Sequence, residues 1–286
     1  MRQGPVKLFH ISDIHFGLED RQALAWVEDC IGSERPDAVV ITGDLTMRAR
    51  HREYEAACAG ISALDVPATM VIGNHDMPYF NPIERFFDPY RRFRGIRSIV
   101  EAELDLGDIA IVPLKTTARA QWRTNWSKGW ITRPALEKTL AQIDALPAGT
   151  RVLVSAHHPL VEVNHHGNVL TKRGTHTLEE LAKRKVMGVL SGHVHDPFDL
   201  VEQTPSGPVR MIGAGTLSKR IRSTPPSFNQ ILVTERGVQV EARNLEHVAT
   251  PDMQIDDVPE DAMPPRKPGE PVAPVGSVPA VDPPVH

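Results

Sequence analysis

Aspartate, asparagine and histidine side chains stand at the ends of five apolar runs of this sequence. They are Asp13 and His15, then Asp44, then Asn74, His75 and Asp76, then His157 and His158, and finally His193 and His195. Carboxylate oxygens and imidazole nitrogens are ligands for Mn, Fe and Zn ions. Cysteine is absent from the set, which excludes a thiolate-bound structural zinc site. These residue types at these positions predict a metal centre built from oxygen and nitrogen donors.

The number of donors indicates two metal ions instead of one. A single tetrahedral ion needs four ligands, whereas this set matches two ions that share a carboxylate. Two ions about 3.5–4 Å apart can clamp an in-line displacement at phosphorus. The expected nucleophile is a bridging hydroxide, because metal ions lower the pKa of bound water. The chemistry expected of this centre is therefore the metal-dependent hydrolysis of a phosphoester.

The elements that must position these side chains follow from the hydrophobic pattern. Three apolar runs, residues 6–12, 36–44 and 66–76, alternate with two segments of helical spacing, 19–31 and 52–64. This order predicts parallel strands covered by helices, and continuous apolar strands are typical of a sheet buried on both faces. The carboxyl ends of such strands are where ligands bind. The expected fold class is α/β.

The second half of the chain is expected to supply further elements. Apolar strands are predicted at 151–159 and 186–195, each ending in histidines. The alternating segment 101–114 predicts a hairpin that turns near Gly107. Short apolar runs between 198 and 243 predict antiparallel strands that close a second sheet.

The bulk composition limits the function. The 286 residues carry a formal net charge of -4, without the global basic bias of a nucleic-acid-binding protein, although a nucleic-acid partner is not excluded. The N-terminus lacks the apolar core of a signal peptide, and no window has the roughly 18 apolar residues of a membrane span. We therefore expect a cytoplasmic protein with no membrane partner. Nothing in the sequence specifies an oligomeric state.

Five short motifs occur in order between positions 13 and 195: DIH, GD, GNHD, HHP and GHVH. In this order, each after an apolar strand, they resemble the calcineurin-like metallophosphoesterase superfamily. The resemblance implies a four-layer α/β/β/α sandwich with two facing mixed sheets and a site between them. It places this domain at residues 1–247. The remainder, 248–286, is rich in proline and lacks aromatic residues, so we expect a disordered tail there.

The resemblance also implies a role for each motif residue. The implied ligands of a first metal ion are Asp13, His15 and His195, those of a second are Asn74, His157 and His193, and the bridge between the ions is Asp44. His75 would face the scissile phosphate, where it stabilises developing charge or protonates the leaving oxygen, and Asp76 would orient His75. The choice of His157 over His158 follows the family pattern, in which the ligand stands two residues before the proline.

The resemblance narrows the activity further. The HHP and GHVH forms are most similar to those of bacterial cyclic-nucleotide and glycerophosphodiester phosphodiesterases. The expected substrate is therefore a small phosphodiester, either a cyclic nucleotide or a glycerophosphodiester, and the expected cofactors are two divalent or trivalent transition-metal ions (Mn, Fe or Zn). A phosphomonoesterase or a nuclease that uses the same site is an alternative. A non-catalytic metal-binding scaffold is another, disfavoured because the chain keeps every ligand.

One further segment has two interpretations. Residues 116–130, TTARAQWRTNWSKGW, place Trp122, Trp126 and Trp130 among basic side chains. Base stacking on tryptophan and phosphate contacts from arginine would suit a nucleotide. The alternative is a loop that its tryptophans anchor to the core.

Overall fold

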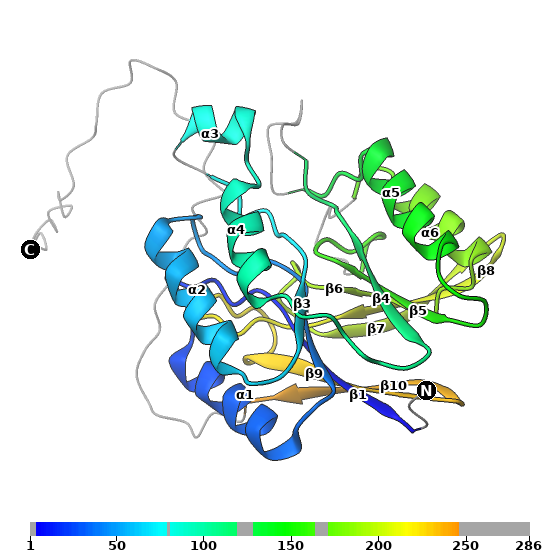
Figure 1. The fold of residues 1–286 in the computed structure, drawn as a ribbon, viewed down its shortest axis with the longest axis horizontal. Coiled ribbons are helices and arrows are strands. Elements are labelled where there is room, and N and C mark those ends of the chain that lie inside the picture. The colour runs from blue at the N-terminus through cyan, green and yellow to red at the C-terminus, as the bar shows by residue number, and fades with distance from the viewer. Residues whose placement is uncertain (1–3, 79–80, 119–127, 164–170, 246–286) are drawn as a thin grey trace, which may run out of the picture. The chain divides into compact units, whose positions relative to one another are not determined.

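The computed structural model describes residues 4–78, 81–118, 128–163 and 171–245 (Figure 1). They build two five-stranded mixed sheets, with strand orders β10-β9-β1-β2-β3 and β4-β5-β6-β8-β7. The strands are β1 (Val6–Ile11), β2 (Ala38–Ile41), β3 (Ala68–Met70), β4 (Ile109–Leu114), β5 (Arg151–Ala156), β6 (Gly188–Ser191), β7 (Phe198–Thr204), β8 (Gly207–Gly213), β9 (Ser227–Thr234) and β10 (Gly237–Asn244).

Each sheet combines neighbouring parallel strands with antiparallel ones, and β9 runs antiparallel to both β1 and β10. In the first sheet Leu8 of β1 pairs with Ala38 of β2, and β2 pairs in parallel with β3. In the second sheet β4, β5, β6 and β8 are parallel neighbours, and β7 runs antiparallel to β8. Every residue of β2 and of β6 is buried, as expected for central parallel strands. Within each sheet, the carboxyl ends of these strands lie at one edge.

Alternation along β1 shows how the sequence divides its apolar side chains between two cores. Phe9 and Ile11 pack into the core beneath the helices, whereas Val6 and Leu8 pack into the core between the two sheets. Successive side chains of a strand point to opposite faces, so one buried strand serves both cores. Full burial of an aliphatic or aromatic side chain of this kind contributes about 1.5–3 kcal/mol.

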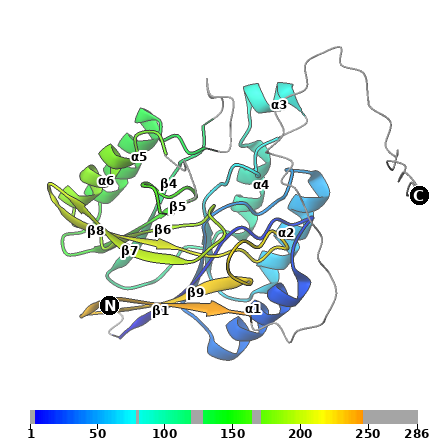
Figure 2. The ribbon, with the colours of Figure 1, turned by 180° about the vertical axis from the view of Figure 1, so that it is seen from behind.

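Helices cover the outer face of each sheet (Figures 1 and 2). The first sheet packs on α1 (Arg21–Glu34), α2 (His51–Ala63) and α4 (Arg91–Val100), and the second on α5 (Arg133–Asp144) and α6 (Gly174–Lys183). A short helix, α3 (Pro82–Phe87), precedes α4. Leu8 and Val40 from the first sheet meet Leu153 and Leu190 from the second. The four-layer α/β/β/α architecture with two facing mixed sheets is confirmed.

Three features differ from the sequence-based expectation. The hairpin at 101–114 is wrong, because residues 101–106 form no strand and β4 pairs in parallel with β5. Leu106 accounts for the misleading alternation, since it is buried between the sheets without belonging to a strand. The strands between 198 and 243 divide between the sheets, with β7 and β8 in the second and β9 and β10 in the first. Helices α3 and α4 lie in a stretch for which the sequence predicts no element.

Some expectations concern residues outside the described ranges, namely the tail 248–286 and Trp122 and Trp126. Trp130 is described: its backbone N–H donates to the carbonyl of Thr116 (2.8 Å), and the Lys172 ammonium lies 4.3 Å from its ring centroid. The described residues belong to one compact unit, Met1–His247. None of the helices described has the length and hydropathy that crossing a bilayer requires.

Candidate metal centre

The predicted site residues follow the carboxyl ends of strands from both sheets. Asp13 and His15 follow β1, Asp44 follows β2, and residues 74–76 follow β3. From the second sheet, residues 157–158 follow β5 and residues 193–195 follow β6. Ring nitrogens and carboxylate oxygens of these residues form overlapping groups whose atoms lie within 4.8 Å of one another. The structure thus brings side chains that are up to 182 positions apart, Asp13 and His195, into one buried cluster.

Left-handed backbone positions this cluster. Five predicted ligands have positive φ: Asp13 (53°), His15 (51°), Asp44 (51°), His193 (71°) and His195 (63°). Residues with a Cβ atom rarely adopt this conformation, which costs about 1–2 kcal/mol for each residue. Such strain is concentrated at functional sites, where surrounding contacts hold it in place. The repetition of the same strained turn after β1, β2 and β6 indicates a site shaped for function.

Two glycines allow the loops to approach closely. A Cβ atom on Gly73 would collide with the backbone N and carboxylate of Asp44, and one on Gly192 would collide with Ser12 and Asp13. Neither position therefore tolerates a side chain without movement of the chain. The loop after β3 can touch the loop after β2 for this reason, and the loop after β6 can touch the loop after β1.

A first group of donors comprises Asp13, His15 and His195. Oδ1 of Asp13 lies 3.2 Å from Nε2 of His195 and 3.7 Å from Nε2 of His15. The other oxygen of Asp13 accepts from the Ser12 hydroxyl (2.6 Å) and the His193 N–H (2.8 Å). Among the described residues, buried Oδ1 has no hydrogen-bond partner. A buried carboxylate oxygen of this kind is costly unless a cation satisfies it, so the group fits a metal ion.

A second group is formed by atoms that only accept hydrogen bonds. Nδ1 of His157 lies 2.8 Å from the carbonyl of Thr42, so it carries the proton and Nε2 has the lone pair. Nε2 then faces Oδ1 of Asn74 (3.0 Å) and Oδ2 of Asp44 (3.3 Å). Three acceptors that converge need a cation. Burial opposes the charging of His157, but Asp44 outweighs it and raises the pKa of His157 to about 9.

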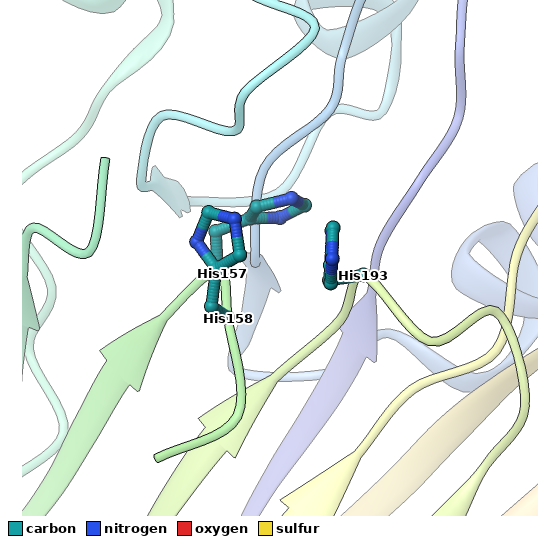
Figure 3. Close-up of side chains that lie close together, drawn as sticks. All are labelled: His157, His158 and His193. Atoms are coloured by element: carbon teal, nitrogen blue, oxygen red, sulfur yellow. The ribbon is translucent and has the colours of Figure 1, made fainter. Parts of the chain in front are cut away.

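His193 and His158 stand beside this second group. Figure 3 shows the three imidazoles of His157, His158 and His193 gathered above the ends of β5 and β6. The centroid of the His193 ring lies 5.1 Å from that of the His157 ring and 4.4 Å from that of the His158 ring. Nδ1 of His158 is 2.8 Å from the hydroxyl of Thr116, and this hydrogen bond orients the His158 ring. Both histidines of the HHP motif therefore reach the centre.

Asp44 lies between the two groups. Its Oδ2 is 3.3 Å from Nε2 of His157 and 3.9 Å from Nε2 of His15. Its Oδ1 accepts the backbone N–H of His75 (2.8 Å). Burial alone would favour the neutral carboxyl, but the neighbouring histidines, chiefly His157, lower the pKa of Asp44 well below its usual value. One ionised carboxylate thus touches the side chains of both groups.

His75 and Asp76 border the cluster. Nδ1 of His75 is 2.7 Å from the carbonyl of Met47, and the ring stands edge-on to that of His15 with centroids 4.8 Å apart. The Asp76 carboxylate accepts from the backbone N–H groups of Thr46 (2.8 Å) and Gly73 (3.0 Å). Asp76 therefore holds the loops on either side of His75, while Met47 orients the ring. Burial and the charge of Asp44 raise the pKa of Asp76 to about 6.

Comparison with known proteins agrees with this geometry. The family model described as calcineurin-like phosphoesterase matches residues 6–197, about two thirds of the chain. The chain belongs to the calcineurin-like phosphoesterase family. Members of this family are metal-dependent phosphoester hydrolases with a dinuclear metal centre. As a calcineurin-like phosphoesterase, the protein is an enzyme.

Individual relatives are distant. The chain is 26% identical over 211 residues to the glycerophosphodiester phosphodiesterase GpdQ of Enterobacter lignolyticus, a match that covers 66% of this chain and 70% of that protein. A dimetal phosphatase from Danio rerio has a TM-score of 0.64 at 16% identity, covering 84% of this chain and 96% of that one. The purple acid phosphatase PPD1 of yellow lupin has a TM-score of 0.60 at 15% identity, with 85% and 52% covered. These two likenesses show the fold of the calcineurin-like phosphoesterases.

Sequence reasoning missed the groups that hold the motif residues in place. The carbonyls of Thr42 and Met47 orient His157 and His75, and the carbonyl of Arg220 lies 2.7 Å from Nδ1 of His195. Every residue carries a carbonyl, so no pattern of residue types marks these partners. Arg220 also belongs to no motif, yet its side chain contacts His75. Only the folded chain reveals it as a neighbour of the phosphoesterase centre.

Proposed function

We infer that this enzyme is a phosphodiesterase that hydrolyses small phosphodiesters at a dinuclear metal centre. The observation that carries the proposal is the position of Asp44, whose carboxylate touches His15 on one side and His157 on the other. The name of the relative GpdQ supports a glycerophosphodiester as the substrate class. The same site would also accept a cyclic nucleotide, in which the phosphodiester closes a ring.

The ligand assignment follows from the two groups. Asp13, His15 and His195 would hold one ion, and Asn74, His157 and His193 would hold the other. Asp44 would bridge them. His157 is preferred over His158 because its Nε2 faces Asn74 and Asp44, whereas Thr116 holds a ring nitrogen of His158. All these donors are oxygen or nitrogen atoms, which suits Mn, Fe or Zn.

When bound, two such ions lower the pKa of water and neutralise charge on the phosphate oxygens. The residues of the chain orient the centre. The carbonyls of Thr42 and Arg220 fix the histidines His157 and His195 so that Nε2 of each faces inward. His75 would border the scissile phosphate, where the leaving oxygen needs a group that stabilises its developing charge.

Hydrolysis adds the oxygen of water to phosphorus and breaks the bond from phosphorus to the leaving oxygen. The electron pair of that bond stays on the leaving oxygen, which ends with one of the protons of water. An open-chain diester gives a phosphomonoester and an alcohol, and a cyclic diester gives one product that carries both groups. The chain must therefore supply groups that stabilise negative charge on the leaving oxygen while the bond breaks.

Substrate profiling of the purified protein, loaded with Mn²⁺, tests the proposal. Glycerophosphoethanolamine, bis(4-nitrophenyl) phosphate, cyclic AMP, 4-nitrophenyl phosphate and single-stranded DNA would be compared by kcat/KM. We expect the small diesters to be hydrolysed faster than the monoester and the DNA. Faster hydrolysis of the monoester or of DNA would contradict the proposal, as would a lack of turnover of every diester.

A further inference from the structure

The guanidinium of Arg220 contacts His75, a histidine of the centre to which no metal ion is assigned. Its Nη1 lies 3.1 Å from Nε2 of His75 and 3.9 Å from the sulfur of Met47. Arg220 is partly exposed, and it lies 145 positions from His75 in the sequence. The contact therefore depends on the fold, and both residues are partly exposed.

The partners of His75 are compatible with only one form of its ring. A carbonyl oxygen can only accept, so Nδ1 must donate its proton to Met47. A guanidinium can only donate, so Nε2 must accept from Arg220 with its lone pair. In this arrangement Nε2 of His75 accepts the hydrogen bond and the guanidinium donates it. The hydrogen-bond donor at this border of the centre is therefore Arg220.

The loop that carries Arg220 is fastened to the centre by several hydrogen bonds. The Arg220 carbonyl accepts from Nδ1 of His195, and its N–H donates to the hydroxyl of Ser218 (3.2 Å). Asp196, next to His195 in the chain, accepts from the backbone N–H groups of Ser223 (3.1 Å) and Thr224 (3.0 Å). Arg220 thus touches a proposed metal ligand with its backbone and His75 with its side chain. These backbone and side-chain contacts together fix the position of the guanidinium.

We propose that Arg220 is a catalytic residue that donates a hydrogen bond to the leaving oxygen of the substrate, and that His75 positions it for this contact. The inference rests on the proposed phosphodiesterase function. As the bond from phosphorus to the leaving oxygen breaks, that oxygen keeps the electron pair and becomes negatively charged. Arg220 keeps its proton, because a guanidinium does not deprotonate in proteins, and stabilises the anion until water supplies the proton.

This assignment makes the contribution of Arg220 depend on the leaving group. A 4-nitrophenolate is a weak base and departs with little help, phenolate needs more, and the alkoxide of a glycerophosphodiester needs most. Loss of a positioned donor to a developing oxyanion typically lowers the rate by about 100-fold to 1000-fold. A side chain that only supported the fold would affect all three substrates alike.

The experiment compares Arg220→Met with Arg222→Met in the full-length, metal-loaded enzyme. Arg222 lies in the same loop and is exposed, so its replacement controls for the loss of one positive charge. The substrates are bis(4-nitrophenyl) phosphate, diphenyl phosphate and glycerophosphoethanolamine. For Arg220→Met we expect kcat/KM to fall less than about 10-fold on the first and about 100-fold or more on the last. Arg222→Met should leave all three within about twofold of wild type.

Two results would overturn the inference while the proposed function stands: equal losses on the three diesters, or losses no larger than those of Arg222→Met. A wild-type enzyme that turns over no diester would instead overturn the proposed function, and with it the inference. Thermal unfolding and metal analysis show whether Arg220→Met is folded and loaded. Should it fail to fold, Arg220→Lys, which keeps the charge but loses the planar fork, serves in its place, with the same order of losses at smaller size.

Discussion

The left-handed backbone at His193 predicts an unusual order of stability between two variants. His193→Gly and His193→Ala both remove the imidazole, and they differ only by a Cβ atom. Alanine is ordinarily favoured, because glycine has more conformational freedom to lose and the Cβ atom adds buried apolar surface. At φ 71° the Cβ atom is strained instead, at a cost of about 1–2 kcal/mol. The strain therefore offsets the usual preference for alanine at this position.

The same pair of substitutions at His158 isolates the strain. His158 is buried in the same centre, but it is not among the described residues with positive φ. The entropy of glycine and the burial of Cβ act at both positions, so they cancel when the two pairs are compared. The remaining difference is the strain at His193. The difference in free energy of unfolding between the glycine and alanine variants should favour glycine by about 1–2 kcal/mol more at His193 than at His158.

Urea unfolding of the metal-free proteins, treated with chelator, measures this quantity. The free energy of unfolding of each variant comes from the midpoint and slope of its transition, and equal slopes show that the variants unfold in the same way. We expect the glycine variant to gain stability relative to the alanine variant at His193 and to be less stable than the alanine variant at His158. A difference between the two pairs close to zero would refute the reasoning that the turn after β6 is strained.

Two further substitutions test other parts of the structure. His10 is buried between Thr42 and Asn229, and burial lowers its pKa to about 3. Below pH 6.5 the folded protein thus binds fewer protons than the unfolded chain. When the pH is lowered from 6.5 to 4, the free energy of unfolding measured in urea should therefore fall by about 3 kcal/mol more for wild type than for His10→Gln. Parallel pH profiles of the two proteins would contradict this. Gly73→Ala should destabilise the protein by more than about 1 kcal/mol and reduce metal affinity, because the new Cβ would collide with Asp44. Unchanged unfolding and metal titration curves would show that the loops are not in close contact.

The sequence predicts the metal centre well because each donor follows a strand. Asp13, Asp44 and His157 stand after apolar runs that the structure shows as β1, β2 and β5, and parallel strands bring such ends together. The positions of the strands in the sequence thus predict which side chains converge. The conformations that aim them are not visible in the same way, since positive φ at His15 or His193 has no signature in residue type.

The elements that the sequence did not predict correctly have weaker local signals. Leu106 alternates with polar neighbours as a strand residue would, yet it is buried at a turn before β4. In helix α4 arginines separate the apolar residues, of which Phe93 and Ile96 are buried. The contact between Arg220 and His75 joins two loops of opposite halves of the chain. Contacts of this kind depend on tertiary packing, which no local pattern records.

One carboxylate, that of Asp44, is proposed to serve two metal ions, and metal stoichiometry is the direct test of this role. Mass spectrometry of the metals in gel-filtered protein, alongside diester hydrolysis, would compare wild type with Asp44→Ala and with Asp108→Ala, a surface aspartate paired with Arg151. We predict two ions per chain and full activity for wild type and Asp108→Ala, because both keep Asp44. For Asp44→Ala we predict fewer than two ions and background activity. Two ions and undiminished hydrolysis in Asp44→Ala would contradict this role.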